Sequence, residues 1–391
     1  MSQKEQESTK TAKGWTGIRR GQTTRPIEWL VEKGILVVSF SAILMVLLIF
    51  IFVTKEALPI FLGTMNSAAT QTILSVEEAN KLKPEALREY LNLTKKEFAD
   101  ADAETRALLI EVRAEAAKDQ SKDKDAKVNT TEWRYLLKAH QWTGYDKPEY
   151  IWQPVGDIHK YNIIPLLIGS LKVSLVALAF ALPIALGAAL YVSQLAHPKT
   201  KEWLKPAIEL LSGIPSVVLG FFALIVLATA LQNIFGYQTR LNAFLAGLSL
   251  GLAVIPLVFS IAEDALTSVP ASYTQAALAL GSSKWQAAWH IVLPAALPGV
   301  FAAAVLGFGR ALGETMIVLM TSSASIISFS LFDSARPITA AIAAELAEAV
   351  FGGHHYRILF MLGALLFSLT FVLNLLADLV ISKLKTQLEG K

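Results

Sequence analysis

The sequence predicts an all-α polytopic membrane protein with six transmembrane helices and a helical extracytoplasmic insertion. Hydrophobic residues make up 53% of the 391 residues, and the mean hydropathy of +0.47 is high for a soluble protein of this size. The apolar residues gather in runs of about 18 or more, the length that an α-helix needs to cross a bilayer. Six such runs are present: 35–54, 163–192, 207–231, 241–262, 295–320 and 357–382.

The basic residues predict which loops face the cytoplasm. Lysine and arginine collect in alternate loops, and cytoplasmic loops of membrane proteins are enriched in both. If the spans alternate in direction, one side receives Arg19, Arg20, Arg25, Lys33, Lys199, Lys201, Lys205, Lys284, Lys383, Lys385 and Lys391. We therefore expect a cytoplasmic segment at 1–34 and a cytoplasmic tail at 383–391. The first span, 35–54, is interpreted as a retained anchor, because its flanks are unlike those of a cleaved signal peptide.

Residues 55–162 form a long insertion that this topology places outside the membrane. Its middle part is rich in acidic and basic residues in nearly equal number, and 94–118 has helical composition. Thr94 and Glu97 also have the spacing of a capping box. A small helical domain is the prediction, and a solvated loop is the alternative. Aromatic residues near its end are expected at the outer lipid surface: Trp133, Trp142, Tyr145, Tyr150 and Trp152.

Several sequence motifs of soluble enzymes are missing. The chain contains no Walker A pattern, no HExxH and no cysteine, so a P-loop ATPase, a zinc protease and a disulfide scaffold are all disfavoured. We expect no catalytic residue, no metal site and no cofactor on this chain, and no nucleic-acid partner.

The loop at 264–294 is predicted to form a helix–turn–helix on the cytoplasmic face. Pro270 can open a helix, and Gly281 can end it by taking a left-handed backbone conformation that other residues avoid. Ser283 and Gln286 then have capping-box spacing for a second helix. The alternative is an amphipathic hairpin that lies on the membrane without a partner.

This loop resembles the EAA loop of ABC importer permeases, which docks a short helix on a separate ATPase subunit. The resemblance rests on fixed spacing between Gln275, Ala276, Ala277, Gly281, Ile291, Leu293 and Pro294. It implies that these residues couple the chain to the ATPase, and that ATP and Mg²⁺ bind there rather than on this chain. Gln275 departs from the family, which usually has glutamate at this position.

Three further stretches resemble the PstC-type permeases of phosphate-specific ABC importers. They are SGIPSVVLGFFAL (212–224), GRALGETM (309–316) and PITAAIAAELAEA (337–349). The resemblance covers about 160–382 and implies a type I importer permease fold, with five spans in a core domain at 163–382. It also implies a second permease, two ATPase subunits and an extracytoplasmic phosphate-binding protein in the inner membrane of a bacterium. The insertion lies outside this resemblance.

Arg310 and Glu314 stand in one of the most apolar stretches of the chain. Ionisable residues inside a membrane are costly and often mark ion paths. A spacing of four predicts that both lie on one helix face, where they can pair. Gly299, Ala303 and Gly307 precede them at the same spacing and predict close packing with other helices. The functional interpretation is that Arg310 attracts an oxyanion and Glu314 selects it; the alternative is an ion pair that only fixes packing.

Other charged residues in or near the spans have simpler explanations. Lys172 is expected to extend towards the outer surface, and its alternative role is to add positive potential to the path. Glu345 is expected near the outer boundary, where water solvates it. Two rival functions stay open: a permease for another oxyanion such as sulfate, molybdate or tungstate, and an ATP-independent channel or membrane scaffold.

Overall fold

The computed structural model describes residues 26–64, 84, 87, 88, 91, 98, 101–120, 125, 128–156 and 158–388. It divides into two compact units, Met1–Phe52 and Val53–Lys391. The first unit contains most of helix α1 (Pro26–Phe61), whose side chains between Trp29 and Phe52 are exposed. The last turns of α1 belong to the second unit, where Ala57 and Ile60 are buried.

The helices confirm an all-α polytopic membrane protein. Among the described residues, five helices are long and apolar enough to cross a membrane, or six if one bent pair counts as a span. The five are Trp29–Phe61, Ile164–Leu195, Ser216–Phe235, Ala243–Thr267 and His354–Lys383, and the bent pair is Lys284–Ala295 with Leu297–Gly313.

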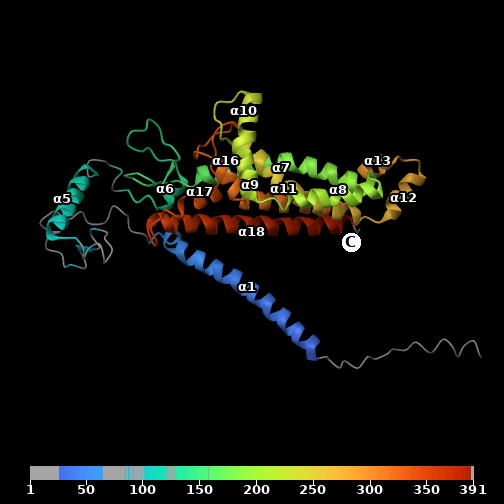
Figure 1. The fold of residues 1–391 in the computed structure, drawn as a ribbon, viewed down its shortest axis with the longest axis horizontal. Helices are drawn as coiled ribbons and strands as arrows, with labels where there is room; N and C mark the ends of the chain where they lie inside the picture. Colours follow the sequence, from blue (N-terminus) through green and yellow to red (C-terminus); the bar gives the residue numbers. More distant parts are fainter. Residues whose placement is uncertain are drawn as a thin grey trace, which may run out of the picture. The chain divides into compact units, whose positions relative to one another are not determined.

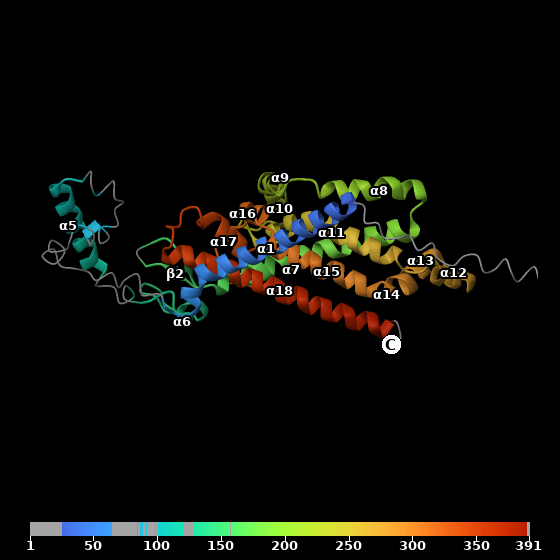
Figure 2. The ribbon, with the colours of Figure 1, turned by 90° about the horizontal axis from the view of Figure 1, so that it is seen from below.

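The core of the second unit is a set of helices that run side by side: α7 (Ile164–Leu190), α11 (Ala243–Thr267), α15 (Leu297–Gly313) and α18 (His354–Leu388) (Figures 1 and 2). Small residues let their backbones approach closely. A Cβ atom on Gly299 would lie 2.4 Å from the Cβ of Ala265, and one on Gly307 would lie 2.5 Å from Cγ2 of Val258. Ala303, between them, is fully buried. The packing face predicted from these three residues is therefore confirmed.

The third predicted span, 207–231, is displaced in the structure. Helix α8 (Pro198–Leu211) ends before Pro215, and the apolar segment then continues through α9 (Ser216–Phe222), the π-helical turn η5 (Ala223–Leu227) and α10 (Ala228–Phe235). The break follows from Pro215, because the residue before a proline disfavours helical backbone angles. The span is thus Ser216–Phe235, and residues 207–211 belong to a separate helix with charged residues on one side.

One carboxylate at the end of α11 is buried beneath α8. The Glu263 residue is 1% exposed, and its two carboxylate oxygens lie 3.2 Å from Lys201 Nζ and 2.6 Å from Lys205 Nζ. Thr267 Oγ1 donates a further hydrogen bond to it at 3.1 Å. Lys201 and Lys205, which marked a basic loop in the sequence, therefore also tie α8 to α11.

We expect the two partners of this cluster to respond differently to substitution. Replacing both Lys201 and Lys205 with methionine leaves a buried carboxylate unpaired, a change that costs about 3–5 kcal/mol in buried ion pairs. Glu263→Gln frees two lysines that are already partly exposed, so its cost is smaller. The thermal unfolding midpoint of the purified protein in detergent should fall much further in the double lysine variant. Equal midpoints would contradict this account.

The insertion combines helices with a small hairpin that the sequence did not predict. Helix α5 (Ala103–Gln120) follows Asp102, whose carboxylate accepts a hydrogen bond from Thr105 N at 2.8 Å; Thr94 and Glu97 lie outside the described residues. Helix α6 (Trp133–Leu137) precedes two antiparallel strands, β1 (Trp152–Gln153) and β2 (Lys160–Tyr161).

Two of its aromatic residues do not lie at a lipid surface. Trp142 and Trp152 are only 4% and 6% exposed, and Trp152 packs with Leu136, Tyr161 and Ile163 against Leu359 and Met361 of α18. For these two residues the predicted position at the membrane interface is wrong. Trp152 instead joins the end of the insertion to the helical core of the second unit.

Candidate functional site

The predicted helix–turn–helix is present at one end of the second unit. Helix α12 (Ala271–Ala279) begins after Pro270, and Gly281 has φ +89°. Helix α13 (Lys284–Ala287) opens with a complete capping box, in which Ser283 Oγ accepts from Gln286 N and Gln286 Oε1 accepts from Ser283 N. Both turn signals read from the sequence are confirmed. The chain then continues through η6 (Ala288–Val292) and α14 (Leu293–Ala295).

This helix–turn–helix, residues 271–287, is called the helical hairpin, and it and the residues that follow it expose a partly apolar surface. Gln275, Ala276 and Gly281 are exposed, whereas Ala277 is buried against the hairpin itself. Ile291 and Pro294 are exposed and Leu293 is half-buried. Leu280 is 88% exposed, and the stacked rings of Trp285 and Trp289 lie 5.8 Å apart beside it in the chain. Most residues expected to couple to another subunit are therefore accessible to one.

The fifth predicted span, 295–320, is interrupted twice. The helix axis bends by 72° between α14 and α15. Helix α15 then ends at Gly313, and α16 (Met316–Thr321) begins three residues later. Between them Glu314 takes an extended backbone conformation, with φ −68° and ψ 133°. Interrupted helices are typical of transporter substrate sites, because they leave backbone groups unpaired inside the membrane region.

This interruption separates Arg310 from Glu314. Arg310 is exposed on the last turn of α15, and Glu314 is half-buried just beyond its end. Within the described residues no ion pair joins them, and Glu314 Oε1 instead accepts a hydrogen bond from Thr315 N at 3.3 Å. The expectation that both residues share one helix face and pair there is therefore corrected. The reason is that the helix stops one residue too early.

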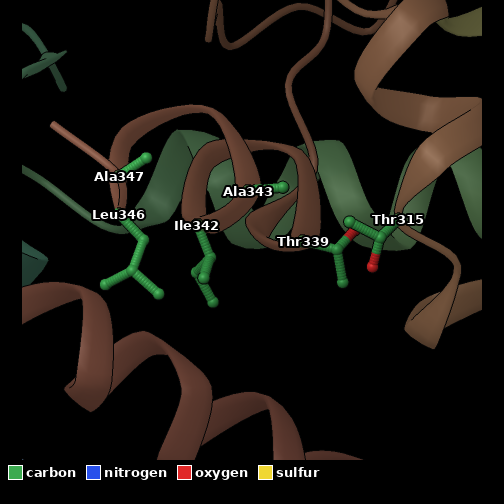
Figure 3. Close-up of a pocket in the computed structure, with 6 residues that line it drawn as sticks. All are labelled: Thr315, Thr339, Ile342, Ala343, Leu346 and Ala347. Atoms are coloured by element: carbon green, nitrogen blue, oxygen red, sulfur yellow. The ribbon is translucent and has the colours of Figure 1, made fainter.

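A pocket of about 420 Å³ opens beside this interruption, lined by Thr315, Thr339, Ile342, Ala343, Leu346 and Ala347. Figure 3 shows the two threonines together at one end and the apolar side chains along α17 (Ile338–Glu345). Thr339 Oγ1 donates to the Glu314 carbonyl oxygen at 2.8 Å. One of the freed backbone acceptors is thus satisfied by a residue from another helix. Nothing in the sequence near Thr339 marked it for this role.

A polar cluster surrounds Glu345, which is 8% exposed. Trp152 Nε1 donates to Glu345 Oε1 at 3.0 Å, Arg336 Nη1 lies 3.1 Å from the same oxygen, and His355 Nε2 lies 3.4 Å from Oε2. The expected solvation of Glu345 is therefore wrong. Burial raises the pKa of its carboxyl group, although the Trp152 hydrogen bond and the Arg336 charge act in the opposite direction.

The side chain of Lys172, on α7, forms hydrogen bonds within the protein. Its Nζ donates to the Ser328 carbonyl oxygen at 2.9 Å and to that of Ser330. Both acceptors lie in the loop that connects α16 to α17. The expected extension of Lys172 to the outer surface is replaced by a fixed contact with this loop.

Within the described residues, no group of three or more histidine, cysteine, aspartate or glutamate side chains has the geometry to hold a metal ion. The charged residues described above are instead Arg310 and Glu314, which are separate from one another at the interrupted helix, and the cluster around Glu345.

Comparison with known proteins agrees with this architecture. The family described as "Binding-protein-dependent transport system inner membrane component" matches residues 166–386, more than half of the chain. The "Phosphate transport system permease protein PstC" of Pasteurella multocida is 34% identical over 264 residues, covering 61% of this chain and 80% of that protein. The "Probable ABC transporter permease protein YqgH" of Bacillus subtilis is 32% identical over 235 residues, covering 60% and 76%.

Among solved structures, the inward-facing MetNI methionine ABC transporter (CY5 native crystal form) is similar with a TM-score of 0.45 and 19% identity. The similarity covers 57% of this chain and 95% of that one, but at this score it carries no argument of its own. The family match, together with the bundle of membrane-length helices and the exposed hairpin, decides the assignment. The chain belongs to the family of binding-protein-dependent transport system inner membrane components.

Proposed function

We propose that this chain is the transmembrane permease subunit of an ATP-driven phosphate importer. The observation that carries the proposal is the interrupted helix at Glu314, with exposed Arg310 on its last turn, in a chain similar to several phosphate permeases. Its partners are a second permease, ATPase subunits and an extracytoplasmic phosphate-binding protein. ATP and Mg²⁺ belong to the ATPase subunits, and this chain has no catalytic role of its own.

The translocation path accounts for the exposure of Arg310. If the path forms between two permease subunits, the side chains that line it are exposed when one subunit is considered without the other. A cation there attracts an oxyanion, and guanidinium groups form strong charge-assisted hydrogen bonds with phosphate. Glu314 lies four residues further on, where its carboxylate can accept the O–H that phosphate retains near neutral pH. Sulfate has no such proton, so the same carboxylate repels it.

The exposed hairpin at 271–287 accounts for coupling to the ATPase. Its small residues Ala276 and Gly281 permit a close approach, and the apolar side chains of Leu280 and Ile291 offer surface to bury. Helix α15 follows the hairpin through η6, α14 and the 72° bend. A displacement of the hairpin by the ATPase would therefore reach Arg310 along one continuous segment of chain.

The function is tested by uptake of labelled phosphate into vesicles that contain the whole complex and ATP, with unlabelled sulfate, molybdate or tungstate as competitor. We expect ATP-dependent phosphate uptake that these competitors do not inhibit. Inhibition by one of them at equal concentration would identify another oxyanion as the substrate. Uptake without ATP would identify a channel.

The proposed orientation gives a separate prediction. Both termini and residues 264–294 should be cytoplasmic, and 66–150 should lie outside, because every short lysine-rich loop is then inside. Single cysteines placed at 120 and at 280 are clean probes, since the natural chain has none. A membrane-impermeant maleimide added to intact cells with a permeable outer membrane should label position 120 and not position 280. The opposite labelling pattern would refute the orientation.

A further inference from the structure

A second pocket, of about 660 Å³, opens at the outer end of the second unit. One wall is the end of the insertion, including Tyr145, Glu149 and Tyr150, and the other is the loop 324–327 that follows α16. Arg336 also lines the pocket. The hairpin 271–287 is at the opposite end of the same unit (Figures 1 and 2). The pocket is therefore placed where a substrate would enter from outside.

Hydrogen-bond donors are available along one side of this pocket. The guanidinium group of Arg336 has five N–H donors, and its one interaction within the described residues is the ion pair with Glu345. The side chain remains 25% exposed. The backbone amides of residues 323–327 donate no hydrogen bond to any described part of the chain. Further along the same loop, the amides of Ser330 and Phe332 donate to the hydroxyl groups of Ser328 and Ser330. Ser325 adds a half-buried hydroxyl.

The backbone around Arg336 is fixed by α7. A Cβ atom on Gly169 would lie 2.6 Å from the Arg336 carbonyl oxygen, so only glycine permits this approach. Ser170 Oγ, on the next residue, accepts a hydrogen bond from Ile338 N at 2.8 Å, and both partners are buried. Glu345 holds the guanidinium itself. Donors held in place before a ligand arrives bind it with less loss of entropy.

We infer that this pocket is an entry site for inorganic phosphate, in which Arg336, Ser325 and the free amides of 324–327 bind the anion before it reaches Arg310. The inference rests on the proposed function and adds a second binding site to it. Arginine with backbone N–H groups is a donor set suited to phosphate oxygens. The carboxylates of Glu345 and Glu149 lie near the same space and weaken the attraction. A weak site suits an anion that must leave again.

The pocket is also linked to the interrupted helix. Thr339, which bonds the Glu314 carbonyl oxygen, is three residues from Arg336, and the loop 322–337 begins at the end of α16. A ligand bound to Arg336 is therefore connected to Glu314 through residues 336–339 and one hydrogen bond. In this proposal, phosphate binds first near Arg336 and then near Arg310.

The test titrates phosphate-loaded binding protein against uptake by the complete complex in vesicles. Arg336→Gln should lower the maximal uptake rate about tenfold, the loss expected for one charged hydrogen bond. The concentration of binding protein at half-maximal uptake and the stimulated ATPase rate should stay unchanged. Glu345→Gln keeps an acceptor oxygen for both Trp152 and Arg336 and removes the competing charge, so it should raise the maximal rate.

Three results would overturn the inference. If Arg336→Gln changes only the half-maximal concentration of binding protein, the arginine contacts that protein instead. If both single variants lose assembled complex and Arg336→Gln/Glu345→Gln regains it, the pair is structural. If Arg336→Gln transports as the wild type does, the pocket is not on the route.

A second readout separates this inference from the proposed function. Labelled inorganic phosphate is equilibrated with the whole complex in a phosphate-free detergent, without binding protein, and wild type is compared with Arg336→Gln. We expect binding about tenfold weaker in the variant. Equal binding refutes the entry site even if phosphate uptake is normal. Absence of wild-type uptake refutes the function, whatever the binding result.

Discussion

Arg310→Gln is expected to reduce phosphate uptake to near background while the complex still assembles. The anion loses its counter-charge in a path of low dielectric constant, and a hydrogen bond to a charged group contributes about 1.5–3 kcal/mol, or roughly 10- to 150-fold in rate. Arg310 is exposed and has no ion pair within the described residues, so its removal leaves no buried charge behind. Initial uptake rates and the yield of purified complex are the two measurements. Arg310→Lys, which keeps the charge but not the planar donor geometry, is the matched control and should retain part of the rate.

Glu314→Gln should behave differently from the arginine variant. The amide keeps the size of the side chain and an acceptor oxygen, but it no longer repels an unprotonated oxyanion. We expect an assembled complex whose uptake is impaired or whose exclusion of sulfate is relaxed. Competition by sulfate is measured at saturating binding protein, so that selection by that protein does not mask the effect of the substitution.

The double variant Arg310→Gln/Glu314→Gln distinguishes two roles for these residues: lining the translocation path, or forming an ion pair that only fixes helix packing. A packing pair requires that each single change lowers the yield of complex and that the double change restores it. The interruption at Glu314 and the lack of contact between the two side chains argue for separate roles. Normal assembly together with normal transport in the double variant would show that neither residue lines the path.

Gly281→Val is expected to abolish both substrate-stimulated ATP hydrolysis and uptake without preventing membrane insertion. No atom lies within 4 Å of the position that a Cβ would take on Gly281, so space is not the obstacle. The obstacle is the φ angle of +89°, which a β-branched residue adopts only at a cost of about 1–3 kcal/mol. The turn that ends α12, closed by Ser282 N to Ala277 O at 3.1 Å, would open and displace α13.

The measurement is ATP hydrolysis stimulated by loaded binding protein, together with uptake, in the purified complex. Gly281→Asn is the matched control, since asparagine tolerates positive φ better than valine and should retain most of the stimulation. Wild-type uptake in the valine variant would mean that the turn does not transmit the motion. Loss in both variants to the same extent would mean that any side chain at 281 obstructs the partner, and the backbone argument would then be wrong.

Features that depend on neighbouring residues could be predicted from the order of the residues. Apolar runs identified the membrane helices, because the length needed to cross a bilayer is a property of one segment. Gly281 and the Ser283–Gln286 capping box predicted the turn and the start of α13, since a left-handed backbone and a helix cap involve residues at most three apart. The face of Gly299, Ala303 and Gly307 was likewise visible from four-residue spacing.

Features that depend on residues far apart in the chain could not be predicted and became visible in the folded structure. Glu345 is paired with Trp152, 193 positions earlier in the chain, and Glu263 with Lys205, 58 positions earlier; no local pattern specifies such partners. The end of α15 at Gly313 also escaped prediction. Its freed Glu314 carbonyl is satisfied by Thr339, 25 residues later. A buried charge or an interrupted membrane helix is stable only when such partners exist, because an unpaired polar group in an apolar surrounding is costly. The sequence therefore shows which charged and polar residues stand in apolar segments, and the folded structure supplies the partners that make their burial stable.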